Sequence, residues 1–306
     1  MKDATLASSA VFDAEEGFDA FEKLFGVTKG KRRNHTKGFC VEGIFAPVDP
    51  RVRTYSSSPI FSGTSTVVAR VSHKGGKANP RDDQYGLLGM GLEITTANGD
   101  LHVIGMNTEH FFPVATSRDF IELLQAKAAG PDATKAFAAQ HPEFRAYKNY
   151  HEALDKTLRP YEGTTFNSLN TFYLVDAEGK KSAMRFSFQP SGEQEIVVDT
   201  HADFFLENMQ KNINEGSVSW DMIVTLANPD DAILDPSKQW SGDHVTITAG
   251  RFTAQNAMPE SDGQCDRLNF DPMVLSEGFA PSEDPMLRAR SMIYALGAVK
   301  RLSEKD

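Results

Sequence analysis

The segment 284–301 reads DPMLRARSMIYALGAVKR, and its composition predicts a helix near the end of the sequence. Arg290 lies four residues before Tyr294 and Arg301 lies seven residues after it, so the three side chains would share one face of the helix. A guanidinium beside the phenol would favour the phenolate, and a phenolate is a ligand for ferric iron. For this segment alone, an amphipathic helix that happens to contain arginine and tyrosine is the simpler interpretation.

A second group of polar residues lies far upstream. His35 follows Arg32 in one short motif, Ser72 follows Arg70 in another, and Asn107 precedes a threonine in a third. A neutral imidazole can move a proton between the two oxygens of a peroxide, and a neighbouring hydroxyl can fix its tautomer. A carboxamide can hydrogen-bond the peroxide without competing for the proton. Each motif alone is weak, because such residues are usually structural.

Taken in order, these motifs resemble those of the haem catalase superfamily, and most closely those of the short catalase-related peroxidases, which keep the haem-binding core and little else. The resemblance extends over residues 20–303, and its segments are RRNHTKG at 32–38, RVS at 70–72, IGMNT at 104–108, DPSKQW at 235–240, LNFDP at 268–272, GFAPSED at 278–284 and RSMIY at 290–294. Because separate motifs fall in the family's order, the resemblance is specific.

The resemblance implies that the chain binds haem b and that the two groups of residues face each other across it. Tyr294 would be the iron ligand, and Arg290 would hold the phenol in its charged form. On the peroxide side, His35 would be the acid–base residue, Ser72 would hydrogen-bond its ring, and Asn107 would polarise the peroxide.

Further residues would hold the cofactor itself. Arg32, Arg70 and Arg301 match family arginines that pair with the haem propionates. Guanidinium groups suit this task because they meet a carboxylate through two parallel hydrogen bonds. One of the two neighbouring phenylalanines, Phe112 or else Phe111, would pack near the haem ring.

The function implied by the resemblance is that of a haem-dependent peroxidase. It would reduce hydrogen peroxide or organic peroxides with small organic electron donors, and its catalase activity would be weak. Two departures from the family pattern point the same way: Tyr294 is followed by Ala-Leu-Gly instead of Pro-Asp-Thr, and Asn34 replaces a small apolar residue before the distal histidine.

Three alternatives stay open from the sequence. One is a small true catalase, and a second is a relative that rearranges lipid hydroperoxides, like an allene oxide synthase on the same haem fold. The polar Asn34 keeps this second alternative open. The third is a haem carrier or sensor without turnover, and the presence of both His35 and Asn107 argues against it.

Composition limits the other partners and the compartment. The formal net charge of −10 argues against non-specific binding of nucleic acid or of an anionic membrane surface. Cys40 and Cys265 are the only cysteines and predict buried thiols instead of a disulfide framework. We find no apolar run long enough for a signal peptide, which favours the cytoplasm, and the alternative is a periplasmic protein whose leader has been removed. Assembly into a homo-oligomer stays open.

The rest of the sequence predicts an α+β fold. Helices are expected over 11–25, in several short pieces within 117–157, over 201–214 and over 284–302. Gly26 would end the first helix and Asp284 would cap the last one.

Strand-like runs rich in β-branched and aromatic residues occur at 38–46, 63–72, 87–96, 101–107, 167–175, 182–190, 217–227 and 243–250. The Asn-Gly pair at 98–99 predicts a hairpin between the third and fourth runs. Two groups of four strands, with helices between and after them, suit a closed eight-stranded antiparallel β-barrel. The resemblance implies the same catalase-like architecture, and the whole chain, 1–306, is predicted to be a single haem-binding domain.

Overall fold

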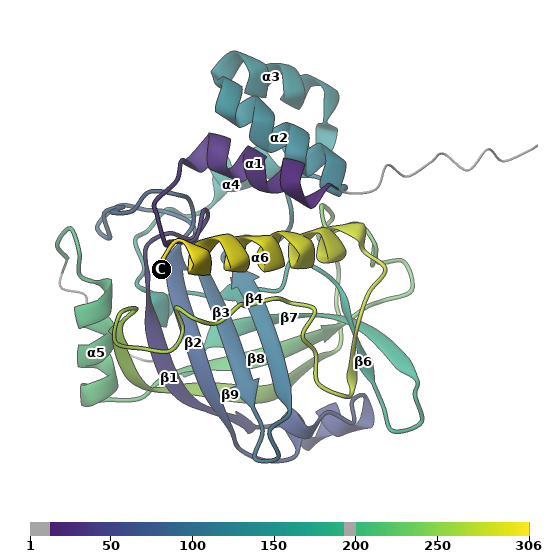
Figure 1. Ribbon diagram of the computed structural model, residues 1–306. Coiled ribbons are helices and arrows are strands. Elements are labelled where there is room, and N and C mark those ends of the chain that lie inside the picture. Colours follow the sequence, from purple (N-terminus) through teal and green to yellow (C-terminus); the bar gives the residue numbers. More distant parts are fainter. Residues whose placement is uncertain (1–12, 193–199, 306) are drawn as a thin grey trace, which may run out of the picture.

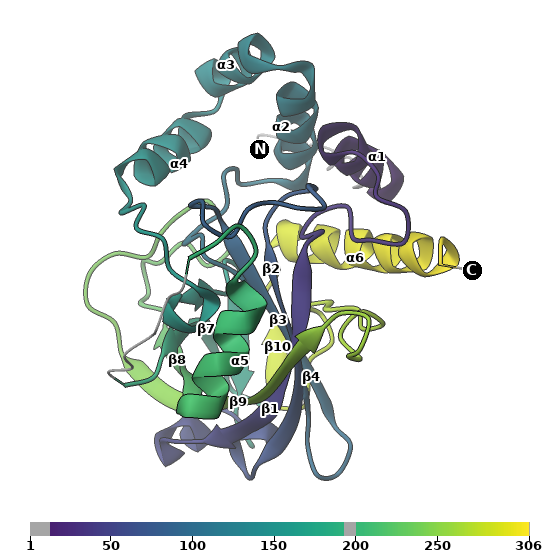
Figure 2. The same cartoon turned by 90° about the vertical axis from the view of Figure 1, so that its left-hand side faces the viewer.

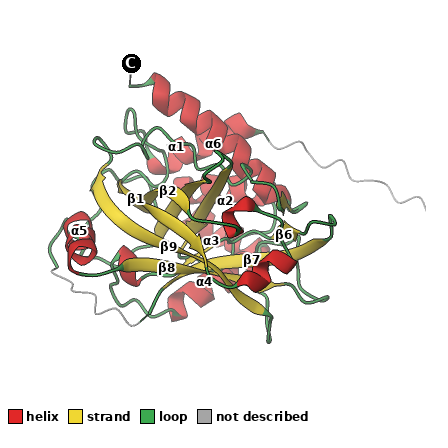
Figure 3. Cartoon of the chain, turned by 90° about the horizontal axis from the view of Figure 1, so that it is seen from below, coloured by secondary structure: helices red, strands yellow, loops and turns green. Residues whose placement is uncertain are grey.

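A computed structural model describes residues 13–192 and 200–305. Its strands form a closed antiparallel ring in which each strand pairs with the next and β9 returns to β1 (Figures 1 and 3). In ring order the strands are β1 (Gly38–Pro47), β2 (Ser65–His73), β3 (Leu88–Thr95), β4 (Leu101–Asn107), β5 (Phe166–Asn167), β7 (Lys181–Pro190), β8 (Val218–Leu226) and β9 (Thr246–Pro259). The predicted eight-stranded barrel is therefore confirmed.

Large apolar side chains fill the inside of this barrel. Phe45, Phe188, Trp220 and Phe252 come from four different strands and are fully buried. The rings of Trp220 and Phe252 stack with their centroids 5.5 Å apart. The barrel interior is thus a packed core, as expected for an eight-stranded barrel, and a ligand site has to lie elsewhere.

The predicted strand 167–175 is two strands in the structure. Its first residues form β5 of the ring, whereas β6 (Phe172–Val175) and β10 (Phe279–Pro281) extend the sheet beside β7. Leu169 lies between the two pieces with φ of 64°, a left-handed conformation that ends the strand. The sequence signal for a single strand was wrong here because a bulky leucine gives no warning of such a turn.

Helices cover one side and one end of the barrel. They are α1 (Ala14–Phe25), α2 (Ser117–Ala129), α3 (Pro131–Gln140), α4 (Pro142–Ala153), α5 (Phe205–Glu215) and α6 (Pro285–Ser303), with short 3-10 turns at η1 (Pro50–Thr54), η2 (Pro59–Phe61) and η3 (Tyr161–Gly163). Helix α6 crosses the sheet beside β2, β3 and β4, and α1 and α2 pack over α6 (Figures 1 and 2). As predicted, Gly26 ends α1 and the Asp284 carboxylate caps α6 by accepting from the backbone amide of Met286. Among the described residues, none of these helices is long and apolar enough to span a membrane.

The prediction of two buried thiols was wrong. Cys40 on β1 and Cys265, in the segment between β9 and β10, form a disulfide, with their Cα atoms 5.4 Å apart. Two cysteines separated by 225 residues give no pairing signal in a sequence, so only the fold could reveal the bond. Closing so long a loop removes much of the conformational freedom of the unfolded chain, worth up to about 5 kcal/mol in chain-entropy models.

Candidate active site

A cavity of about 370 Å³ lies between the barrel and helix α6. One wall comes from the outer face of β2, β3 and β4 together with the loop before β1, and it carries His35, Ser72 and Asn107. The opposite wall comes from α6 and carries Arg290 and Tyr294. The residues predicted from widely separated motifs therefore line one cavity.

Strand register explains how the barrel wall is arranged. Ser72 on β2 lies opposite Gly89 on β3, and Gly89 lies opposite Asn107 on β4, so the three residues form one row across the sheet. The imidazole of His35 covers the middle of this row. A Cβ atom at position 89 would lie 2.5 Å from its Cε1 atom, so only glycine leaves room for the ring. Gly89 could not be recognised from the sequence, because a glycine on a strand does not reveal what packs above it.

The backbone of His35 adopts φ of 62°, which is uncommon for a residue other than glycine. Asn34 holds this turn: its side-chain oxygen accepts hydrogen bonds from the amides of His35 at 3.0 Å and Gly75 at 2.8 Å. This oxygen therefore supports the loop, which weakens the argument that Asn34 acts on a lipid hydroperoxide. Unusual backbone conformations of this kind are concentrated at functional sites.

The hydrogen bonds of His35 fix which ring nitrogen is free. Its Nδ1 atom lies 3.0 Å from the hydroxyl oxygen of Ser72, and that hydroxyl donates a long hydrogen bond of 3.5 Å to the Gly89 carbonyl. Nδ1 then carries the proton, and Nε2 keeps its lone pair. Burial lowers the pKa of His35 well below its usual value, and the positive charges of Lys74 and Arg70 lower it further. The lowered pKa keeps the imidazole neutral, so that one ring nitrogen is available to accept a proton.

Asn107 contributes an unpaired polar atom. Its side-chain oxygen is buried and has no hydrogen-bond partner among the described residues. Leaving a buried acceptor unpaired costs about 1–3 kcal/mol, and such groups are otherwise rare in folded proteins. The unpaired oxygen is consistent with a carboxamide whose missing hydrogen bond would come from a bound ligand.

On the helix wall, Arg290 and Tyr294 converge on Gly105 of β4. A Cβ atom there would lie 3.5 Å from a guanidinium nitrogen of Arg290 and 3.6 Å from the phenol oxygen of Tyr294. Arg290 also donates to the Asn170 side chain at 2.5 Å and to the Gly105 carbonyl at 3.3 Å, while Asn170 donates to the Asp284 carboxylate at 2.6 Å. This chain of hydrogen bonds fixes the guanidinium beside the phenol, and a direct Arg290–Tyr294 contact stays a prediction.

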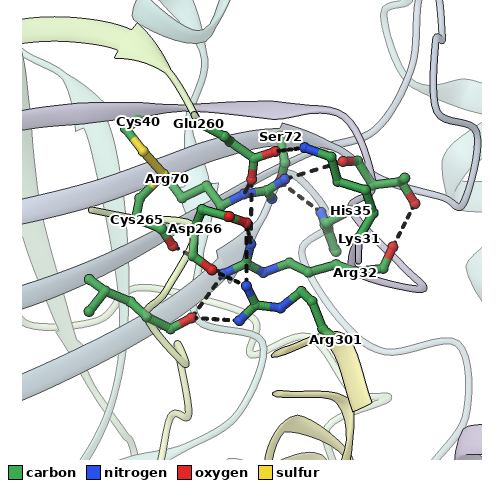
Figure 4. Close-up of polar contacts among 12 residues, drawn as sticks. Lys31, Arg32, His35, Cys40, Arg70, Ser72, Glu260, Cys265, Asp266 and Arg301 are labelled. Carbon is green, nitrogen blue, oxygen red and sulfur yellow. Dashed lines mark hydrogen bonds and ion pairs between the residues drawn. A yellow bond between two sulfur atoms is a disulfide. The ribbon is translucent and has the colours of Figure 1, made fainter. Parts of the chain in front are cut away.

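The three arginines predicted to bind propionates gather at one edge of the cavity (Figure 4). Arg70 contacts Glu260 at 2.5 Å and Arg32 contacts it at 3.4 Å, while Arg301 lies 3.3 Å from Asp266. Three guanidinium groups thus share two carboxylates, which leaves positive charge for an anionic ligand.

The pKa values of Arg32 and Glu260 reflect the same excess of positive charge. Burial lowers the pKa of Arg32, and the neighbouring charges of Arg70 and Arg301 lower it further. Burial alone would raise the pKa of Glu260, but Arg70 and Lys31 outweigh it and bring that pKa to about 2. The cluster is therefore suited to take up carboxylates such as propionates.

The disulfide holds the segment that positions these arginines. Arg32 donates to the backbone carbonyls of Cys265 and Leu268, and Arg301 donates to those of Asp266 and Leu268. Because Cys265 is bonded to the barrel, the carbonyl groups are fixed relative to β1. Glu260 and Asp266 could not be recognised from the sequence, since acidic residues in a loop are usually solvated.

Both phenylalanines considered for the haem ring line the cavity. The guanidinium of Arg290 lies 5.7 Å from the centroid of the Phe112 ring. Phe111 packs instead against Tyr147 and Tyr150, with centroid distances of 5.8 and 5.1 Å. The choice of Phe112 stays a prediction.

These residues fit a haem group in their chemistry. A phenol faces the cavity from the helix, an imidazole and a carboxamide face it from the barrel, and guanidinium groups lie at one edge. A tyrosine side chain is one of the groups that hold haem iron in proteins, and the two propionate carboxylates of a haem would pair with guanidinium groups.

Comparison with known proteins gives consistent matches. A model of the catalase family matches residues 22–305. A protein named catalase-related peroxidase from Synechococcus elongatus is 31% identical over 300 residues, covering 94% of this chain and 88% of that protein. Another of the same name from Mycolicibacterium paratuberculosis is 28% identical, with 92% of each chain covered. A catalase from Danio rerio is 25% identical, and the match covers 85% of this chain but 54% of that protein.

Proposed function

Because the chain belongs to the catalase family, we propose that it is a haem-dependent peroxidase that reduces hydrogen peroxide or organic peroxides with small organic donors. One observation carries the proposal: a single cavity joins His35 and Asn107 on the barrel to Tyr294 on α6. The cofactor proposed is haem b held without covalent bonds, since the sequence contains no Cys-x-x-Cys-His attachment motif.

The protein's own residues have distinct roles in this proposal. Tyr294 would hold the iron, Arg290 would stabilise the phenolate, and the arginine cluster of Figure 4 would bind the propionates. When bound, the haem supplies the redox centre at which the peroxide O–O bond is broken. The free Nε2 atom of His35 would take the proton from the inner peroxide oxygen and return it to the outer one, which leaves as water. Asn107 would orient the peroxide.

Donor oxidation is expected to exceed oxygen release. The exposed residue Lys127 lines both the cavity and a groove on the surface of α2–α4, and the proposal places the entry of the organic donor at this residue. To test this, donor oxidation and oxygen evolution are measured in the same peroxide-limited mixture with haem-loaded protein. Fast oxygen release with negligible donor oxidation would identify a small catalase instead, and the absence of both would contradict the peroxidase proposal.

The disulfide is relevant to the cellular compartment in which the protein is found. Disulfides persist in oxidising surroundings and are rare in the cytosol, so the Cys40–Cys265 bond favours the periplasmic alternative over the predicted cytoplasm. We expect protein recovered from its native cells under rapid thiol alkylation to carry no alkyl group on either cysteine. Alkylation of both cysteines in that experiment would mean that the bond is reduced in the cell and would restore the cytoplasmic prediction.

A further inference from the structure

The cavity contains more positive charge than haem binding requires. In a chain with a formal net charge of −10, Glu109 is the one acidic residue among those that line it in the described ranges. The lining cations are Arg32, Arg33, Arg70, Lys74, Lys127, Arg290 and Arg301. Four of these arginines are assigned to the haem site, and Arg33 is paired with Glu22 and Glu304. Lys74 and Lys127 remain without a role.

The positive charge of Lys74 is balanced by a carboxylate of the protein. Its ammonium group forms an ion pair with Glu109, and the Tyr147 hydroxyl donates to the same carboxylate oxygen. Glu109 is buried, yet the charge of Lys74 keeps its pKa below the usual value. Lys74 and Tyr147 thus engage one oxygen of this carboxylate, while the other oxygen is buried and has no hydrogen-bond partner among the described residues.

Lys127 is the other of these two lysines. It lies in the last turn of α2 and forms no ion pair with any described residue, and its ammonium group lies 5.7 Å from the centroid of the Phe144 ring. Although Lys127 is exposed at the surface, the protein around its ammonium group desolvates it and, with the positive charge of Lys74, lowers its pKa to about 8, while the charge of Glu109 acts in the opposite direction. The ammonium group thus has no ion-pair partner among the described residues, and it is exposed where an anion from solution could reach it.

The residues around Lys127 indicate which chemical class of anion it would bind. Lys127 lines both the cavity and the groove between α2, α3 and α4, and the exposed Lys135 and Lys148 also line this groove. No acidic residue lines the groove within the described part of the chain. On the cavity side, aromatic rings prevail, including those of Phe111 and Phe120. A cation at the entrance and aromatic walls beyond it suit an aromatic anion.

We propose that Lys127 binds the carboxylate of the organic donor and so selects phenolic acids over neutral phenols, with Lys135 and Lys148 attracting them to the groove. This inference rests on the proposed peroxidase function, which supplies the oxidising reaction. Two phenol molecules would each lose one electron and one proton, and the two electrons and two protons would convert hydrogen peroxide to two molecules of water. Lys127 is a specificity residue in this proposal and takes no part in proton transfer at the peroxide.

A matched pair of donors tests the proposal: 3-(4-hydroxyphenyl)propionate and its methyl ester carry the same phenol and differ in charge. With haem-loaded protein at low ionic strength, the acid is expected to have a KM about tenfold lower than that of the ester, the size expected for one charge-assisted hydrogen bond. Lys127→Met should remove this preference, Lys127→Arg should keep it, and added salt should weaken it. Lys180→Met, an exposed lysine of the turn between β6 and β7, is the control and should change nothing.

Equilibrium binding gives a readout that does not depend on turnover. The haem-loaded protein should bind 3-phenylpropionate about tenfold more tightly than 3-phenylpropanol, and Lys127→Met should equalise the two dissociation constants. Equal binding of the acid and the alcohol by the unmodified protein, or a preference that survives in Lys127→Met, would overturn the proposal. If the protein oxidised neither donor, the peroxidase function would fail while this binding experiment still decided the role of Lys127.

Discussion

Replacement of His35 by alanine is expected to slow the reaction with peroxide by about two to four orders of magnitude while haem stays bound, the usual effect of losing a general acid–base. The reason lies in the geometry of the barrel wall. Ser72 engages Nδ1 of the ring, Gly89 lies directly beneath it, and Nε2 is left free to accept a proton. Alanine at position 35 offers no group that could move the proton from one peroxide oxygen to the other.

The measurement is stopped-flow mixing of haem-loaded protein with hydrogen peroxide. Asn107→Ala is the matched comparison and should slow the reaction less, because a carboxamide orients the peroxide but carries no proton. The unmodified protein should keep its rate as the pH falls through 6.5. Burial and neighbouring cations lower the pKa of His35, so the ring stays neutral below the pH at which a free histidine becomes protonated. Equal rates for His35→Ala and the unmodified protein would refute the role of His35.

Replacement of Tyr294 by phenylalanine is expected to remove most of the haem, or to abolish the absorption spectrum of a tyrosinate-ligated ferric haem. The phenol oxygen of Tyr294 on the helix wall is the proposed iron ligand, and phenylalanine would fill nearly the same space without that oxygen. Because the ring packs against the buried cluster formed by Cys40, Val103, Cys265 and Phe270, a variant that keeps the ring should keep the local packing.

Haem content per polypeptide and the visible spectrum are measured after saturation with haem and removal of the excess. Tyr173→Phe is the matched control, since this tyrosine lies on β6 and is not part of the cavity wall. Far-UV circular dichroism separates loss of haem from loss of fold. Retention of both the haem content and the native spectrum in Tyr294→Phe would show that another group holds the iron.

The barrel was predictable because each strand has a recognisable local sequence pattern. Alternating β-branched and aromatic residues placed six of the eight ring strands within a few residues at both ends, and they placed the start but not the longer extent of β9 (Thr246–Pro259). The segment 167–175 resisted this approach, because the left-handed turn at Leu169 depends on contacts made by its neighbour Asn170 with Asp284 and Arg290. Such contacts bring together residues more than one hundred positions apart and leave no local signal.

Site residues were predictable when their own side-chain chemistry is specific. They were not predictable when their role depends on which residues surround them in the fold. His35 and Tyr294 could be proposed from their motifs, and both line the cavity. Gly89 could not, because its importance comes from the ring that lies on it. The acidic partner Glu260 could not either, since a carboxylate joins an arginine cluster only after the chain has folded.

The disulfide has a consequence for the integrity of the molecule. It closes residues 40–265 into a covalent ring, and His35 and Tyr294 lie on the two tails that leave this ring. Both tails start at the same sulfur bridge, so the two candidate residues are joined by a path of about thirty-five residues that bypasses the ring. A single cut by a protease anywhere within the ring, including the exposed helices α2 to α4, would therefore leave one covalent molecule with the distal and proximal residues still tethered to each other. The two candidate residues would in this sense stay linked after a nick in an exposed surface segment, which is a preferred place for proteolysis.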